Sequence, residues 1–198
     1  MQRWADFILA FAALLLLAPP LAVIALCVAI FMGRPIFFRQ DRSGLGGVPF
    51  QLIKFRSMRS DRDRLGQLLP DHLRTTRLGR VLRRTRLDEL PELWNILRGD
   101  MALVGPRPLL PDTIADLGAA GVLRSSVRPG LTGLAQISGN TLLPPGDKIA
   151  LDLFYVRERM PGLDVRILLR TPFMMILGER IDRDLLEEAY ARNSGGIR

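Results

Sequence analysis

Cysteine, histidine and aromatic residues are scarce in this sequence, and each scarcity argues against one class of structure or function. The single cysteine, Cys27, cannot form an intramolecular disulfide, so stability must come from a packed core, and a reducing compartment is allowed. The single histidine, His72, lies in a polar, charged stretch, where a solvated surface role is expected instead of a catalytic one. Aromatic residues make up 7% of the chain and no nucleic-acid recognition motif is present, so no nucleic-acid partner is expected.

Charged residues are absent from residues 7–32, which form a long apolar run near the N-terminus. A straight helix over this run would be about 39 Å long, which exceeds the hydrocarbon core of a bilayer. Pro19 and Pro20 stand at its midpoint, where they remove two backbone donors and strip partners from carbonyls one turn upstream. Because unpaired carbonyls are costly in hydrocarbon, the sequence predicts a re-entrant helix-break-helix instead of a straight crossing.

Arginines flank both ends of this apolar run and bear on its topology. Arg3 precedes the run, and Arg34, Arg39 and Arg42 follow it. The positive-inside rule then favours both ends in the cytoplasm, which predicts a monotopic protein on the cytoplasmic face of the inner membrane. A single spanning helix is the alternative, whereas a signal peptide is disfavoured because the apolar run is too long.

The chain of 198 residues has a formal net charge of +8, and its basic excess lies mainly within residues 34–107. A basic excess beside an apolar anchor favours anionic membrane lipids and phosphate-bearing substrates, although a solvated basic surface is the plainer alternative. The length and the absence of repeats predict a membrane segment over 1–33 and one catalytic domain over 34–198. The oligomeric state is left open.

Hydrophobic periodicity predicts an α+β domain that is mostly helical. Two β-rich runs around a glycine-rich loop indicate a β-hairpin, and the polar stretch 59–76 is expected to be a loop with a short helical piece. An amphipathic helix is expected near the C-terminal end, lying either on the membrane face or in the core. The predicted strands are 35–40 and 48–55, and the predicted helices are 78–85, one beginning at 88, 113–123, 145–158 and 163–177.

An adjacent acid pair, Asp88 and Glu89, precedes a short helix with apolar residues at helical spacing. Asp88 is expected to be the N-cap of this helix, where free amides and the helix dipole hold a carboxylate ionised. Adjacent carboxylates of this kind suit Mg²⁺, which keeps several waters and bridges phosphate oxygens. The predicted apolar face consists of Leu90, Leu93, Trp94 and Leu97.

A rigid basic turn, Gly105-Pro106-Arg107-Pro108, follows the helix. The two prolines restrict the backbone on either side of Arg107, so its guanidinium can be held toward a phosphate with little loss of entropy. A carboxylate pair facing such a guanidinium indicates chemistry on a phosphate group.

Several motifs follow one another in order along most of the chain. They are PIFFRQDRSG at 35–44, KFRSM at 54–58, the acid-pair run at 87–108, RPGLTGLAQISG at 128–139, and Asp152 with Tyr155-Val156. With these motifs the sequence resembles the bacterial sugar transferases, the monotopic phosphoglycosyl transferases that load a sugar phosphate onto a polyprenyl phosphate. The resemblance covers roughly residues 3–182.

The resemblance implies a two-step reaction. Asp88 would attack the β-phosphate of a UDP-sugar, UMP would leave, and polyprenyl (undecaprenyl) phosphate would then take the phosphosugar from the enzyme. This would be the first membrane step in making exopolysaccharide, capsule, lipopolysaccharide or another glycoconjugate. Glu89 would hold Mg²⁺ with Asp88 or assist the second step, and both roles stay open. The residues expected to bind the phosphate or the substrate are Lys54, Arg83, Arg107, Asn140 and Asp152.

Two positions depart from the pattern of the family. Members break the membrane helix at Ser-Pro, whereas this chain has Ala18-Pro19-Pro20 and lacks the serine hydroxyl. Many members have arginine after the glycine at 139, whereas this chain has Asn140. A neutral amide cannot replace a guanidinium at a phosphate, so Asn140 is the position where donor contacts are expected to differ.

Two other functions fit parts of the pattern. A membrane-tethered basic scaffold would bind anionic lipid and use Asp88 and Glu89 only to cap a helix. A nucleotide-sugar hydrolase would use the same carboxylates with water as the acceptor.

Overall fold

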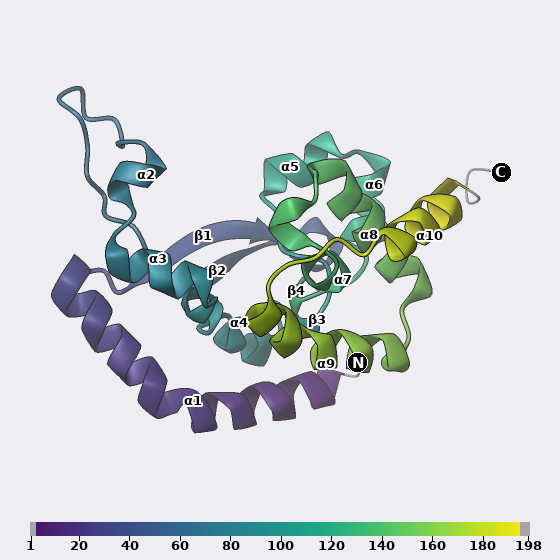
Figure 1. Ribbon diagram of the computed structural model, residues 1–198, viewed down its shortest axis with the longest axis horizontal. Coiled ribbons are helices and arrows are strands. Elements are labelled where there is room, and N and C mark those ends of the chain that lie inside the picture. The colour runs from purple at the N-terminus through teal and green to yellow at the C-terminus, as the bar shows by residue number, and fades with distance from the viewer. Residues whose placement is uncertain (1–2, 195–198) are drawn as a thin grey trace.

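The computed structural model describes residues 3–194 of the chain and is mostly helical, as the sequence predicts (Figure 1). Two small two-stranded sheets, β1–β2 and β3–β4, are embedded among the helices. The α-helices are α1 (Arg3–Met32), α2 (Asp71–Arg74), α3 (Arg77–Arg84), α4 (Glu92–Arg98), α5 (Pro111–Asp116), α6 (Ala119–Arg124), α7 (Leu134–Ile137), α8 (Pro145–Glu158), α9 (Pro161–Leu177) and α10 (Arg183–Ser194). The strands are β1 (Phe37–Ser43), β2 (Pro49–Phe55), β3 (Ala102–Val104) and β4 (Gly130–Thr132), and the short 3₁₀ turns are η1 (Leu45–Gly47), η2 (Leu87–Glu89) and η3 (Asn140–Leu142).

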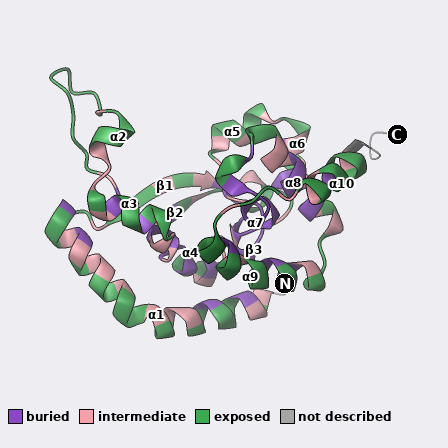
Figure 2. Cartoon of the chain, in the orientation of Figure 1, coloured by how far each residue is buried: buried purple, intermediate pink, exposed green. Residues whose placement is uncertain are grey.

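The apolar N-terminal run forms a single helix, α1, that contains both Pro19 and Pro20. The predicted interruption at the prolines is therefore not a gap in the helix; instead α1 follows a curved path along one side of the domain (Figure 1). Proline removes backbone hydrogen bonds and bends a helix without having to end it. Within residues 3–194, α1 is the one helix long and apolar enough to cross a membrane, and most of its surface is not buried (Figure 2).

The N-terminal end of α1 is bonded to the domain. Arg3 donates to the backbone carbonyls of Ile96 at 2.5 Å and Leu97 at 2.8 Å. These carbonyls belong to the last turn of α4, where helix geometry leaves carbonyls without full intrahelical partners. The Ile96 carbonyl also accepts a hydrogen bond from the Gly99 backbone N–H at 3.0 Å. Asp6 accepts a hydrogen bond from the backbone N–H of Leu103 at 3.3 Å.

The C-terminal end of α1 packs against the same domain. Val28 and Met32 form a buried apolar cluster with Phe55 of β2 and Leu82 of α3. The helix ends at Gly33, whose φ of 72° lies in the left-handed region that ends many helices. Both ends of α1 are therefore anchored to one body, while its middle stays exposed.

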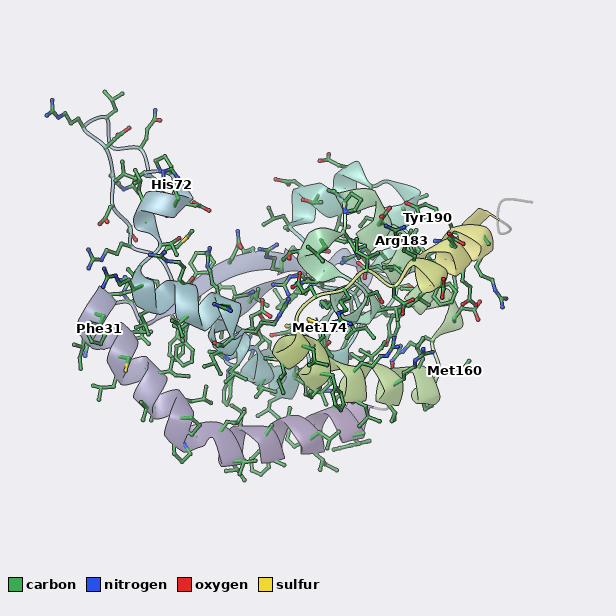
Figure 3. All side chains as sticks on the ribbon, viewed as in Figure 1. Phe31, His72, Met160, Met174, Arg183 and Tyr190 are labelled. Carbon is green, nitrogen blue, oxygen red and sulfur yellow. The ribbon has the colours of Figure 1, made fainter. Side chains whose placement is uncertain are left out.

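The predicted hairpin is confirmed. Strands β1 and β2 pair antiparallel, with Phe38 opposite Lys54, and β1 extends three residues beyond the predicted end. The glycine-rich connection contains Gly46 and Gly47, both with positive φ, which side-chain-bearing residues rarely adopt. The polar stretch that follows β2 projects from the body as a long loop that contains α2, and His72 lies exposed on this projection (Figure 3).

The predicted helices over 78–85, 145–158 and 163–177 are confirmed as α3, α8 and α9. The single helix predicted over 113–123 is wrong, because the chain forms two short helices, α5 and α6. Gly118 separates them with φ 54° and ψ −126°, a conformation that no α-helix contains.

One residue of the predicted apolar face on α4 is placed wrongly. Leu93 is buried as expected, but Trp94 is exposed. Ile96 is fully buried and takes the place that the prediction gave to Trp94 on the buried face. The cause is tertiary: α4 lies between β2 on one side and α1 on another, so the buried surface is set by these neighbours and not by the apolar residues alone. The core itself centres on α8, where Leu151 and Tyr155 are fully buried.

Candidate active site

The acid pair lies on a 3₁₀ turn, η2, that joins α3 to α4. The sequence predicts Asp88 as the N-cap of the helix, and this prediction is wrong. Helix α4 begins only at Glu92, and Pro91 occupies its N-cap position. Arg86 precedes the turn with φ 54°, a left-handed conformation that is unusual for a side-chain-bearing residue. The turn holds both Asp88 and Glu89 in largely buried positions.

Glu89 is surrounded by basic side chains from three separate elements. The Nζ atom of Lys54 in β2 lies 3.0 Å from Oε1, and Arg107 from the loop after β3 donates a close hydrogen bond to the same oxygen. Arg86 lies farther off, with its Nη1 3.8 Å from Oε2. Burial raises the pKa of Glu89, but the charges of Arg107 and Lys54 outweigh it and hold the pKa well below its usual range.

Asp88 has a different environment. No ion pair joins it to a basic residue within residues 3–194. Burial and the neighbouring charge of Glu89 raise its pKa, and the more distant charges of Lys54 and Arg83 oppose this shift. An unpaired, partly desolvated carboxylate beside a fixed positive cluster is suited to attack a phosphorus atom whose oxygens the cluster neutralises.

Glu92, which the sequence prediction missed, is a third carboxylate of this cluster. It is almost fully buried, and Lys54 Nζ lies 3.1 Å from its Oε1. Burial raises the pKa of Glu92 to about 7, with the charge of Lys54 lowering it and that of Glu89 raising it. Its spacing, three residues after Glu89, was the signal available in the sequence, since residues three apart share a helical face.

Helix α4 is fixed to the strand that carries Lys54. The side chain of Asn95 accepts a hydrogen bond from the Ile53 backbone N–H at 3.1 Å and donates one to the Gln51 carbonyl at 2.8 Å. Asn95 thus occupies the place of a neighbouring strand at this edge. The contact sets the relative position of Lys54 and the carboxylates that it pairs.

Two sequence motifs, the Gly-Pro-Arg-Pro turn and the Arg-Pro-Gly loop, form one structural unit. Gly105 donates to the Thr132 carbonyl at 2.9 Å, and Gly130 donates to the Pro106 carbonyl at 2.9 Å. A Cβ atom added to Gly130 would lie 2.1 Å from the backbone nitrogen of Gly105, so the two chains approach more closely than any other residue permits. This packing fixes the backbone from which Arg107 reaches Glu89.

A pocket of about 300 Å³ adjoins the carboxylate cluster, and Arg107 contributes to both. Asp152 of α8 lines this pocket and forms a buried ion pair with Arg124, at 2.8 Å. Arg124 also donates a close hydrogen bond to the backbone carbonyl of Arg107. Burial raises the pKa of Asp152, and the charge of Arg124 opposes this rise.

Asn140 also lines the pocket, and its side chain faces a carboxylate. Its amide donates to Glu179 at 2.5 Å, and the Thr141 backbone N–H donates to the same side chain at 2.9 Å. Glu179 additionally pairs with Arg86 at 2.9 Å, which joins the segment after α9 to the turn that carries the acid pair. The neutral amide at 140 therefore binds a protein carboxylate in this structure.

The predicted site residues therefore form two connected groups. Asp88, Glu89, Lys54 and Arg107 meet at the carboxylate cluster, whereas Asn140 and Asp152 lie at the adjoining pocket. Arg83 of α3 stands apart, donating to Ser57 Oγ at 2.9 Å, although its charge acts on Asp88. The residues that the sequence prediction missed are Arg86, Glu92, Arg124, Gln136 and Glu179.

Asp88 and Glu89 are the candidate ligands for Mg²⁺. No group of three or more His, Cys, Asp or Glu side chains in the described part of the chain is placed to hold a metal ion. Asp88 and Glu89 nevertheless fit the coordination preference of Mg²⁺, which binds one or two protein carboxylates and fills its other positions with substrate phosphates and water. Glu89 is already paired with Lys54 and Arg107, whereas Asp88 could bind a metal ion without giving up an ion pair.

Comparison with known proteins decides the family. The profile of the family described as bacterial sugar transferase matches residues 1–178. The chain belongs to the bacterial sugar transferase family. This finding confirms the resemblance drawn from the ordered motifs, and with it the expectation of a transferase.

Relatives in this family are about 40% identical to the chain over the aligned residues. It is 42% identical over 175 residues to the uncharacterized sugar transferase EpsL of Bacillus subtilis, covering 87% of each protein. It is 41% identical over 180 residues to a UDP-glucose:undecaprenyl-phosphate glucose-1-phosphate transferase of Caulobacter vibrioides, covering 86% of this chain and 67% of that protein. The enzyme of the same name in Escherichia coli is 39% identical over 183 residues. This alignment covers 87% of the chain and 39% of that longer protein.

Proposed function

We propose that this transferase moves a sugar phosphate from a UDP-sugar to undecaprenyl phosphate and releases UMP. The observation that carries the proposal is the meeting of Asp88 and Glu89 with Lys54 and Arg107 in a chain of this family. Relatives are named as undecaprenyl-phosphate glucose-1-phosphate transferases, which supports both the donor class and the acceptor. Such a reaction would begin the assembly of an exopolysaccharide or another glycoconjugate at the membrane.

In the proposed first step, a carboxylate oxygen of Asp88 attacks the β-phosphorus of the donor. The bond from that phosphorus to the bridging oxygen breaks, UMP leaves with the electron pair, and a phosphosugar remains on Asp88. In the second step, a phosphate oxygen of undecaprenyl phosphate attacks the same phosphorus. The bond to Asp88 then breaks, which regenerates the carboxylate and yields the lipid-linked sugar diphosphate.

The basic residues of the cluster support this chemistry electrostatically. Arg107 and Lys54 lie where they can share their charges between Glu89 and the phosphate oxygens of a donor. Bound Mg²⁺, held by Asp88 and Glu89, would neutralise further charge on the diphosphate. Glu89 keeps the arginine fork in place when no donor is bound, since the two side chains are hydrogen-bonded.

We further propose that α1 enters and leaves the membrane on one side, with the catalytic domain on its cytoplasmic face. Arg3 at one end bonds to α4, and Met32 at the other end packs beside α3. A helix that crossed the bilayer would separate these two ends by about 30 Å of hydrocarbon and break one of the contacts. The exposed, apolar middle of α1 is the part that would lie in lipid.

The proposed reaction is tested by incubating the full-length protein with Mg²⁺, undecaprenyl phosphate and a panel of UDP-sugars, and measuring UMP. UMP release that depends on the lipid is the expected result. UMP release that is equal without the lipid would identify a nucleotide-sugar hydrolase instead. Absence of UMP with every donor of the panel would favour a membrane-tethered scaffold, and Asp88→Asn provides the matched negative control.

A further inference from the structure

The pocket beside the carboxylate cluster combines apolar walls with a few buried polar groups. Its walls include Leu117 of the loop after α5, Ala135 of α7 and Ile149 of α8. Gln136 and Asp152 supply polar groups, and Arg107 stands where the pocket meets the acid pair. A ligand in this pocket would therefore extend from the position where the phosphate chemistry takes place.

Gln136 is the most unusual residue of this pocket. It is only 3% exposed, yet neither its Nε2 nor its Oε1 makes a hydrogen bond within the described residues. An unpaired amide in a protein interior is destabilising, because it loses its water partners on burial and gains none. The Oδ1 atom of Asp152 is in the same condition, while its other carboxylate oxygen binds Arg124.

Building on the proposed function, we infer that this pocket binds the uracil base of the UDP-sugar. A primary amide offers one donor and one acceptor side by side, and the imide edge of uracil offers the complementary pair, its N3–H and a ring carbonyl. Gln136 binds this edge with two hydrogen bonds. Asp152 Oδ1 accepts a hydrogen bond from a ribose hydroxyl.

The walls of the pocket favour the base over the sugar of the donor. The flat faces of uracil carry no hydrogen-bonding groups and pack against Leu117, Ala135 and Ile149 without loss. A hexose presents hydroxyls around its whole rim, and these apolar side chains would leave several of them unpaired. With the base at Gln136, the diphosphate passes Arg107 and presents its β-phosphorus to the acid pair.

The inference is tested by ligand binding, without turnover. The affinities of UMP, ribose 5-phosphate and glucose 1-phosphate are measured by calorimetry on the full-length wild type and on Gln136→Leu. Comparing UMP with ribose 5-phosphate isolates the contribution of the base to the affinity. Comparing the wild type with Gln136→Leu isolates the contribution of the amide. The four affinities together form a double-mutant cycle. Gln67→Leu makes the same chemical change at an exposed position and is the control.

In the wild type, UMP is expected to bind at least about tenfold more tightly than ribose 5-phosphate, and Gln136→Leu should abolish most of this difference. The melting temperature of Gln136→Leu should equal or exceed that of the wild type, because the substitution removes an unpaired buried amide. UMP methylated at N3 provides a second measurement that needs no variant, and it should bind the wild type about tenfold more weakly than UMP.

Two results would overturn the inference. One is an unchanged ratio of UMP to ribose 5-phosphate affinity in Gln136→Leu, with N3-methylated UMP bound as tightly as UMP. The other is a selective loss of glucose 1-phosphate binding in Gln136→Leu, which would assign the pocket to the sugar. Either result would leave the proposed transfer intact if UMP release in the presence of lipid persisted, so the two proposals fail separately.

Discussion

At the scale of single residues, the cluster places two neighbouring glutamates on one lysine and shifts their pKa values in opposite directions. Lys54 pairs with Glu89 and with Glu92 at similar distances. Arg107 adds a second positive charge at Glu89, which keeps that carboxylate ionised, whereas burial favours the protonated form of Glu92. The lysine therefore serves mainly Glu89 at low pH and is shared between two carboxylates at higher pH.

Because the pKa of Glu92 is raised, the effect of Glu92→Gln on the stability of the fold should depend on pH. The folded protein raises the pKa of Glu92 from 4.5 to about 7, so it binds a proton more tightly than the unfolded chain does. The free energy of unfolding of the wild type therefore loses a contribution from Glu92 as the pH rises through this window. Glutamine has no such loss, so the melting temperature of Glu92→Gln relative to wild type should increase from about pH 5 to about pH 8.

Thermal denaturation of both proteins across this pH range checks the prediction. Glu188→Gln, on an exposed part of α10, is the control, and its difference from wild type should vary less. A relative melting temperature of Glu92→Gln that stays constant or decreases toward high pH would contradict the assigned environment of Glu92.

The residues of the site were only partly predictable from the sequence. Asp88, Glu89 and Arg107 stand in an ordered motif, and that motif carried their chemistry. Glu92 and Gln136 lie within the same motifs, but nothing local distinguishes a buried polar residue from an exposed one. Glu92 is buried where α4 packs against β2, and Gln136 where α7 packs against α8, and these contacts form only in the folded chain.

At the scale of secondary-structure elements, the contact between β3 and β4 positions the Arg107 turn, and glycine makes it possible. Gly130→Ala is expected to lower the free energy of unfolding by about 1–3 kcal/mol or more, because its methyl group would overlap the backbone of Gly105. UMP release should fall with it, since the turn that carries Arg107 would have to move.

Gly162→Ala is the matched control for this prediction. Gly162 lies in the first turn of α9, and no atom comes within 4 Å of the position of an added Cβ. Its replacement should be neutral or slightly stabilising, since alanine has the higher helix propensity. Equal melting temperatures for the two variants would show that the backbone at Gly130 has room that the structure does not indicate.

Elements with a strong local pattern were predicted, and elements defined by tertiary contact were not. The hairpin and α8 are bounded by glycine or proline, so their ranges were close to those observed. Strands β3 and β4 are three residues each and exist through pairing between distant segments, which no local window contains. The prediction that the prolines interrupt α1 overestimated their effect, because a bend preserves the helix on either side.

At the scale of the whole molecule, the attachment of both ends of α1 to one domain predicts the side of the membrane on which they lie. Trp4→Cys, in a Cys27→Ser background, places a label near the N-terminal end of α1, and Leu65→Cys places one on the exposed loop of the domain. In intact spheroplasts both should resist a membrane-impermeant maleimide, and both should react once the membrane is permeabilised. Labelling of Trp4→Cys alone in intact spheroplasts would establish a single crossing.

The covalent intermediate on Asp88 is the central claim, and intact-mass spectrometry tests it most directly. The wild type is incubated with Mg²⁺ and the active UDP-sugar without lipid, and its mass should increase by that of one phosphosugar. The added mass should disappear when undecaprenyl phosphate is supplied, and Asp88→Asn should acquire none while melting like the wild type, because the substitution is nearly isosteric. An adduct of the same mass on Asp88→Asn, or transfer to lipid by this variant at the wild-type rate, would contradict the assignment of Asp88 as the nucleophile.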